Sequence, residues 1–175
     1  GKIRTGPDSV VKKASLAIDA DTPLFADDAF EYVSRGAYKL VTALDRHLPS
    51  LKNMTTLDIG ASTGGFTDLM LKRGAVKVYS ADVGKGLLHW KLRSDPRVIC
   101  IESLNAREIS ESHVPEKVDI LTMDVSFISV TKILPAADRL LKPGAFAFIL
   151  VKPQFEARRE DVPPGGVVTD PAVRL

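Results

Sequence analysis

The chain has 175 residues, of which 45% are hydrophobic and 26% are charged, and its formal net charge at pH 7 is +2. This length and composition suit one compact domain and are short for two, while so small a net charge does not by itself indicate a nucleic-acid binder. A single cysteine, Cys100, excludes a disulfide framework and is typical of a cytoplasmic protein. No apolar run approaches the roughly 20 residues of a membrane helix.

Both ends of the sequence read as cut. Residues 1–26 combine short strand-like pieces with glycine, proline and an acidic turn. Near the other end, Asp170 and Pro171 predict the start of a helix, but the sequence that follows is long enough for only about one turn. We therefore expect a fragment of a longer protein. Residues 1–26 would be a linker or the tail of a preceding domain, and residues 27–175 the main domain.

From residue 27 onward, helix and strand signals alternate. Asp27 and Asp28 can cap a long helix in which apolar residues recur at helical spacing. Pro49 follows the end of this helix, and Pro143 follows the end of the helix expected over 130–141. The expected helices are 27–49, 66–74, 87–93 and 130–141, and the expected strands are 55–59, 76–82, 97–101, 118–124 and 145–152.

This alternation predicts an α/β fold of the Rossmann-like type, with a mostly parallel sheet covered by helices on both faces. Dinucleotide-binding enzymes and S-adenosylmethionine-dependent methyltransferases share this architecture. In such sheets ligands bind at the carboxyl ends of the strands. Four polar residues stand at those expected ends, namely Asp58, Asp82, Asp124 and Lys152. Strand 145–152 is the most apolar, so we expect it to be the most buried.

The first predicted strand runs into a glycine turn, LDIGASTGGFTD. Ser62 occupies the second glycine position of the dinucleotide pattern G-x-G-x-x-G, so the turn argues weakly for a pyrophosphate site. Asp58 instead suits the cationic amino-acid end of S-adenosylmethionine, and Asp82, about 20 residues further on, suits ribose hydroxyls. A purely structural turn followed by a solvated acid is the alternative.

The fold alone does not separate a methyltransferase from a nucleotide-dependent reductase. The three histidines are isolated and lack metal-ligand spacing, and no Tyr-x-x-x-Lys pair is present. Methyl transfer is therefore favoured, without a metal. In ILVKPQFE, an apolar strand ends at Lys152, which is either a lysine snorkelling to solvent or a partly desolvated amine suited to act as a base.

Six motifs together resemble the TlyA, or hemolysin A, group of FtsJ-like ribose methyltransferases. They are SRGAYKL, LDIGASTGGFTD, ADVGKGLLHWKLRSDPRV, LNAR, MDVSFIS and VKPQFE. The resemblance implies 2′-O-methylation of ribosomal RNA with S-adenosylmethionine, and a small RNA-binding domain before the methyltransferase domain. It places three members of a Lys–Asp–Lys–Glu tetrad on Lys39, Asp124 and Lys152, with the glutamate beyond Leu175.

The candidate catalytic residues are therefore Lys39, Asp124 and Lys152. Repulsion between the two lysines would lower the pKa of one of them, and Asp124 would orient it. The candidate cofactor residues are Asp58, Gly60, Ser62, Thr63, Gly64, Gly65, Phe66, Asp82, Asn105 and Asp124. Candidate RNA contacts are Arg35, Lys39, Arg158 and Arg159, and Trp90 and Phe127 belong either to a stacking surface or to the core. A non-catalytic RNA-binding module and a membrane-active hemolysin remain alternatives.

Overall fold

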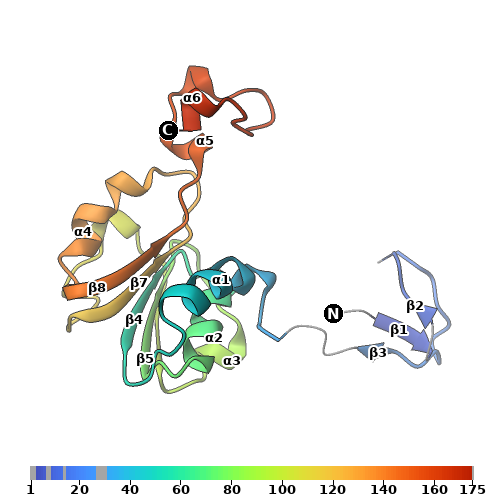
Figure 1. Cartoon of the computed structure of the whole chain (residues 1–175). Helices are drawn as coiled ribbons and strands as arrows, with labels where there is room; N and C mark the ends of the chain where they lie inside the picture. The colour runs from blue at the N-terminus through green and yellow to red at the C-terminus, as the bar shows by residue number, and fades with distance from the viewer. Residues whose placement is uncertain (1–2, 7–8, 14, 27–30, 175) are drawn as a thin grey trace.

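The computed structural model of the chain describes residues 3–6, 9–13, 15–26 and 31–174. Its main sheet has five parallel strands in the order β6-β5-β4-β7-β8 (Figure 1). The chain builds outward from β4 in one direction and then returns to build outward in the other, so the strand order switches between β4 and β7. The strands are β4 (Thr55–Ile59), β5 (Lys77–Ala81), β6 (Val98–Ile101), β7 (Val118–Met123) and β8 (Leu141–Ile149).

Helices cover both faces of this sheet, and each face has its own apolar core. On one face lie η1 (Arg35–Ala37), α1 (Tyr38–His47), α2 (Gly65–Lys72) and α3 (Trp90–Arg93). On the other lie η2 (Ala106–Glu108), η3 (Val130–Lys132) and α4 (Leu134–Asp138). The predicted α/β fold with a parallel sheet is therefore confirmed.

Two predicted helices are shorter in the structure than their patterns suggested. The helix expected from residue 27 begins only at Arg35, because Ser34 accepts a hydrogen bond from the Gly36 N–H and caps the first turn. Its expected start at 27–30 lies outside the described residues. The helix expected over 130–141 is divided into η3 and α4, because Pro135 has no N–H to continue a helix and instead stands in the first turn of α4.

The expectation that strand 145–152 is the most buried is wrong. β8 begins at Leu141, contains an irregularity at Pro143 and Gly144, and ends at Ile149. It is an edge strand of the described sheet, and the side chain of Phe146 is 44% exposed. Every residue of the central strand β4 is buried instead. Burial here follows position in the strand order rather than apolar content.

The first described residues form a separate antiparallel sheet, β2-β1-β3, of β1 (Ile3–Gly6), β2 (Ser9–Val10) and β3 (Phe25–Ala26). Figure 1 shows it apart from the main sheet. After β8 come α5 (Pro153–Glu156), η4 (Arg159–Asp161) and α6 (Pro171–Arg174). Within the described residues, no helix has the length and apolar character needed to cross a membrane. The domain boundary after residue 26 stays a prediction.

Candidate active site

The carboxyl ends of β4 and β7 meet closely at the glycine turn. Gly60 has a positive φ of 81°, and a Cβ atom built on it would lie 2.6 Å from the backbone oxygen of Asp124. Any side chain at this position would push apart the turn after β4 and the segment after β7. Gly60 therefore lets the predicted cofactor turn and the predicted catalytic aspartate share one edge of the sheet.

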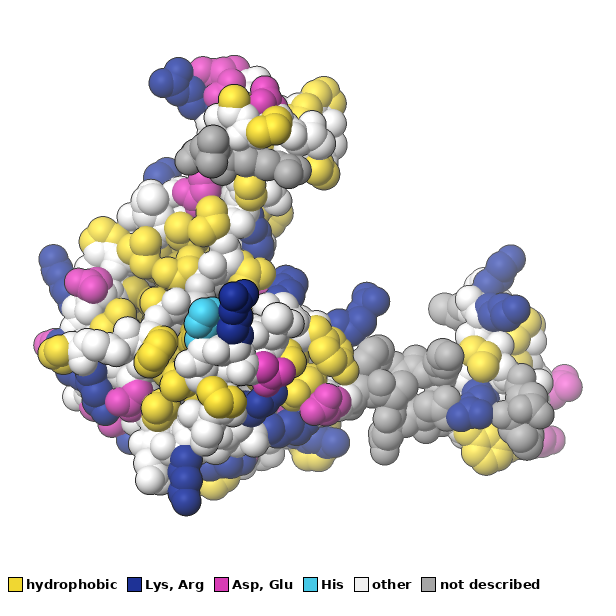
Figure 2. All heavy atoms as spheres, viewed as in Figure 1, with side chains coloured by type: hydrophobic (Ala, Val, Ile, Leu, Met, Phe, Trp, Pro, Cys, Tyr) yellow, Lys and Arg dark blue, Asp and Glu magenta, His cyan; other side chains and the backbone are white. Residues whose placement is uncertain are grey.

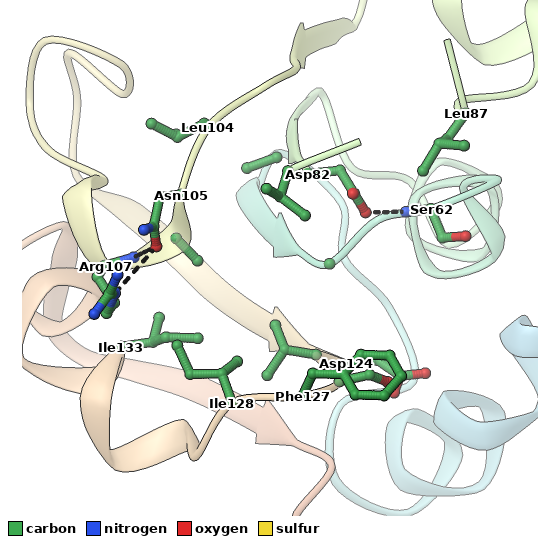
Figure 3. A pocket seen from close by; sticks show the side chains of 16 residues that line it. Ser62, Asp82, Leu87, Leu104, Asn105, Arg107, Asp124, Phe127, Ile128 and Ile133 are labelled. Carbon is green, nitrogen blue, oxygen red and sulfur yellow. Dashed lines mark hydrogen bonds between the residues drawn. The ribbon is translucent and has the colours of Figure 1, made fainter. Parts of the chain in front are cut away.

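A cavity of about 550 Å³ opens beside this turn (Figure 3). Its size lies within the range of small-molecule sites, and most of its lining side chains are apolar. Polar groups stand at its margins: Asp82 and Ser62 on one side, Asn105 and Arg107 on the other, and Asp124 near one end. The apolar lining includes Val83, Leu87, Leu104, Ile128 and Ile133.

The two polar margins of this cavity are held by local hydrogen bonds. Asp82 accepts hydrogen bonds from the backbone N–H groups of Ser62 and Gly84, each at 2.8 Å. Asn105 accepts one from the Arg107 backbone N–H at 3.2 Å and caps η2. Both side chains thus face the cavity from fixed positions, and their contact with a nucleoside stays a prediction.

A second, smaller cavity of about 250 Å³ adjoins the first. Gly60, Ser62, Asp124 and Ser126 line both cavities, which makes them neighbours with a common wall. The remaining residues of the second cavity are Ser34, Gly36, Lys39, Ala61, Thr63, Gly65, Phe66 and Lys152. An apolar cavity and a cavity lined mainly by polar and charged groups therefore meet at Asp124.

The three predicted catalytic residues are brought together from α1, the end of β7 and the end of β8. Lys39 Nζ lies 2.6 Å from Asp124 Oδ2, and Lys152 Nζ lies 2.7 Å from Asp124 Oδ1. Lys152 also donates a hydrogen bond to Ser126 Oγ at 2.8 Å. Lys152 and Asp124 therefore form an ion pair but not a hydrogen bond, because Oδ1 accepts no hydrogen bond from the described residues.

The carboxylate of Asp124 is stabilised in its charged form. Burial raises its pKa, but the close ammonium groups of Lys152 and then Lys39 outweigh burial, so that the pKa lies below its usual range. The side chain of Lys152 is only 22% exposed. It is therefore a partly desolvated, paired lysine and not one that snorkels to solvent.

Asp58 stands in a different place from the one its predicted role requires. It is completely buried, and it lines neither of the two cavities. Its carboxylate accepts hydrogen bonds from Thr67 Oγ1 at 2.7 Å and from Thr122 Oγ1 at 2.9 Å. Burial raises the pKa of Asp58 to about 6, although both hydroxyls oppose this. Direct contact with a cofactor gains no support from this position.

The other residues of the glycine turn divide between cavity lining and packing. Ser62, Thr63 and Phe66 line the second cavity. Gly64 does not; its φ of 95° makes it the left-handed residue before α2. Gly65 has both roles: it lines the second cavity, and a Cβ there would lie 2.5 Å from Ser34 Oγ and 2.8 Å from the backbone nitrogen of Ala37. The sequence pattern assigned all five to the cofactor, but it does not separate these two roles.

The motif MDVSFIS contributes more to the site than the sequence interpretation assigned to it. Ser126 lines both cavities and holds Lys152, yet it was not among the candidates. Phe127 is 92% exposed at the rim of the larger cavity, and Trp90 is 68% exposed. The alternative that these two rings belong to the core is therefore wrong. The position of the serine two residues after Asp124 was the available signal.

Basic side chains do not gather into one patch on the face of the described residues that Figure 2 shows. On the face that Figure 2 shows, Lys and Arg side chains of the described residues are spread among acidic and apolar ones. Arg35, Arg158 and Arg159 are exposed, as a contact with phosphate requires. Arg35 stands between Ser34 and Gly36, which line the second cavity. The role of the three arginines in RNA contact stays a prediction.

Comparison with known proteins adds to this geometry. Residues 32–174 match the family described as FtsJ-like methyltransferase. Over 175 residues, the chain is 44% identical to the 16S/23S rRNA (cytidine-2′-O)-methyltransferase TlyA of Mycobacterium tuberculosis, covering 99% of this chain and 65% of that protein. It is 48% identical over 166 residues to hemolysin A of Brachyspira hyodysenteriae, covering 94% of this chain and 69% of that protein.

A solved structure shares the fold over almost the whole chain. It is that of a protein of Streptococcus thermophilus named as a hemolysin, with a TM-score of 0.81 and 41% identity, covering 99% of this chain and 64% of that one. The chain thus spans about 65% of the length of the TlyA relative. The family match, the parallel sheet and the site at its carboxyl edge agree, and the chain belongs to the FtsJ-like methyltransferase family.

Proposed function

We propose that this chain carries the catalytic site of a ribosomal RNA methyltransferase, which transfers a methyl group from S-adenosylmethionine to a ribose 2′-hydroxyl. The observation that carries the proposal is the carboxylate of Asp124, which is paired with the ammonium groups of Lys39 and Lys152 where two cavities meet. The TlyA relative, which is named as a 16S/23S rRNA (cytidine-2′-O)-methyltransferase, supports ribosomal RNA as the substrate class.

The larger cavity fits the nucleoside part of S-adenosylmethionine. Its apolar walls suit an adenine ring, Asp82 can accept hydrogen bonds from ribose hydroxyls, and Asn105 can bond to a base edge. Ser62, Thr63 and Phe66 in the second cavity would lie beside the remainder of the molecule. When bound, S-adenosylmethionine supplies an electrophilic methyl group.

The residues at the junction would then orient and activate the ribose hydroxyl. A hydroxyl is a weak acid, and its oxygen must lie in line with the methyl carbon and the sulfur, so catalysis consists largely of positioning. Lys152 is fixed by Asp124 and Ser126, and a neutral amine there would accept the hydroxyl proton. Asp124 would stabilise the ammonium that results, and Lys39 would hold Asp124 in place.

The proposed partners and compartment follow from this substrate class. A ribosomal substrate implies a cytoplasmic reaction, which the single cysteine also favours. Exposed Arg35, Arg158 and Arg159 are the proposed phosphate contacts, and residues 1–26 the proposed tail of an RNA-binding domain.

The test is transfer of labelled methyl from S-adenosylmethionine to ribosomal subunits by the full-length protein, followed by digestion to nucleosides. We expect the label on ribose, and we expect Lys152→Ala to abolish it while Lys132→Ala, a change of an exposed lysine, does not. Equal labelling with Lys152→Ala would remove Lys152 from the mechanism. RNA binding without any label would indicate a non-catalytic RNA-binding module, and leakage of liposomes instead would indicate a membrane-active protein.

A further inference from the structure

The segment Lys152–Glu156, which contains α5, contacts the loop Val125–Val130 through three side chains. Lys152 donates a hydrogen bond to Ser126 Oγ at 2.8 Å, and the ring of Phe155 lies 5.2 Å from that of Phe127 between centroids. Glu156 follows with two hydrogen bonds to the end of the loop. The loop is thus attached to this segment at its start, middle and end.

The contacts of Glu156 use both of its carboxylate oxygens. Oε2 accepts a hydrogen bond from Ser129 Oγ at 2.5 Å, and Oε1 accepts one from the backbone N–H of Val130 at 2.9 Å. Val130 is the first residue of η3, so the carboxylate also satisfies an N–H group that has no partner within that short helix. Hydrogen bonds to an ionised acceptor are among the stronger ones in proteins.

The loop needs such support because its own conformation is unfavourable. Phe127 has a positive φ of 64°, a region that residues other than glycine adopt at a cost. Its ring is also 92% exposed, so burial in the core contributes little to holding it there. External contacts must therefore hold Ser126 against Lys152 and Phe127 at the rim of the larger cavity.

We propose that Glu156 is a positioning residue, which fixes the loop Val125–Val130 and through Ser126 the orientation of Lys152. Glu156 lines neither cavity, so it is not itself a catalytic residue. Its role differs from that of the fourth member of the tetrad, because its carboxylate is directed at Ser129 and Val130. The expected effect on kcat rests on the proposed methyl transfer, whereas the expected effect on the conformation of the loop does not.

The test compares three variants of the full-length protein with the parent. Glu156→Ala removes both hydrogen bonds, Glu156→Gln keeps the acceptor for Val130 and the hydrogen-bond partner for Ser129, and Glu160→Ala is a matched control at an exposed glutamate four residues further on. The first measurement is amide hydrogen exchange at Val130, resolved by NMR. The second is kcat for methyl transfer to ribosomal subunits, together with the affinity for S-adenosylhomocysteine.

We expect Glu156→Ala to accelerate exchange at Val130 by at least roughly tenfold, since a charge-assisted hydrogen bond is lost. In the same variant kcat should fall roughly tenfold or more, as displaced catalytic groups lose their alignment, while affinity for S-adenosylhomocysteine changes by less than about threefold. Glu156→Gln should restore most of both losses, and Glu160→Ala should match the parent.

Unchanged exchange at Val130 in Glu156→Ala would overturn the proposal, and so would faster exchange with an unaltered kcat. A fall in kcat that Glu156→Gln does not reduce would also overturn it, because it would indicate a role for the charge itself. If the parent transfers no methyl group, the proposed function fails, but the exchange measurement still decides whether Glu156 holds the loop.

Discussion

Asp58 lies in the central strand β4 and Asp124 directly follows the neighbouring strand β7, and the two carboxylates have different partners. Asp58 is buried and receives hydrogen bonds from two neutral hydroxyls, those of Thr67 and Thr122. Asp124 lies between two ammonium groups at the junction of the cavities. The pKa of Asp58 is accordingly raised, by burial, and that of Asp124 is lowered by its charged neighbours despite burial.

This difference shows that an acid at the end of a β-strand has no fixed role. Neutral hydroxyls satisfy the hydrogen-bonding capacity of a carboxylate without replacing the solvation of its charge, whereas ammonium groups do both. The buried acid therefore supports the glycine turn, and the paired acid is the one that we propose takes part in methyl transfer. The following four predictions test that division.

The same substitution in both places should have very different effects on catalysis. Asp124→Asn leaves two ammonium groups without a counter-charge and removes the group that orients Lys152. We expect methyl transfer to fall by a factor of roughly 100 to 10,000, the range typical of general acid–base groups. Asp58→Asn should keep the rate within about tenfold of the parent, because it alters only support for the turn. Similar losses in single-turnover assays of both variants would contradict the division.

The buried acid should make stability depend on pH in an unusual direction. Because the pKa of Asp58 is about 6 in the folded chain against an ordinary 3.8, the folded state binds its proton more tightly than the unfolded state. This contribution to the free energy of unfolding is therefore largest at low pH and is lost as pH rises from about 4 to 6, with a total on the order of 3 kcal/mol.

Urea unfolding of the parent and of Asp58→Asn, measured from pH 4 to pH 7, checks this sign. The stability of the parent relative to the variant should decline across the interval. The opposite slope is expected of Asp124, whose lowered pKa gives a contribution that is lost as pH falls through that pKa. A parent and variant whose stabilities run parallel with pH would show that Asp58 does not titrate in this interval.

Removing one hydroxyl from the buried group should destabilise the fold without changing the shape of the side chain. Thr122→Val deletes the hydrogen bond to Asp58 Oδ1 and leaves that oxygen buried. We expect a loss of about 1–3 kcal/mol in the free energy of unfolding at pH 7. Thr42→Val, at an exposed position of α1, is the matched control and should change stability by less than about 0.5 kcal/mol. Equal effects would indicate a general cost of the substitution.

The smallest effect is expected at the margin of the larger cavity. Asp82→Asn removes the charge that the proposed ribose contacts use, and it keeps one acceptor oxygen for the N–H groups of Ser62 and Gly84. Affinity for S-adenosylhomocysteine, measured by calorimetry, should fall by about tenfold while stability changes little. Asp138→Asn, at an exposed position of α4, should leave affinity unaltered. No change with Asp82→Asn would remove this residue from the site.

The sequence determined those features that depend on local order. Alternating helix and strand patterns with short links predict a parallel sheet, because successive parallel strands require a crossover between them. The glycine turn after β4 and the polar residues after β5 and β7 could be located from their spacing alone, and the motifs identified the family. A Lys–Asp–Lys grouping was predictable only through that resemblance, since Lys39 lies 85 residues from Asp124.

The tertiary structure alone decided which of these residues face the site. Asp58 is buried because β4 is the central strand and α2 places Thr67 over it, whereas the apolar β8 is exposed because it lies at an edge. Both outcomes depend on strand order, which side-chain periodicity does not encode. The contacts of Ser126 with Lys152 and of Glu156 with the loop after β7 likewise join distant segments, and such contacts arise only when β7 and β8 pair in the sheet.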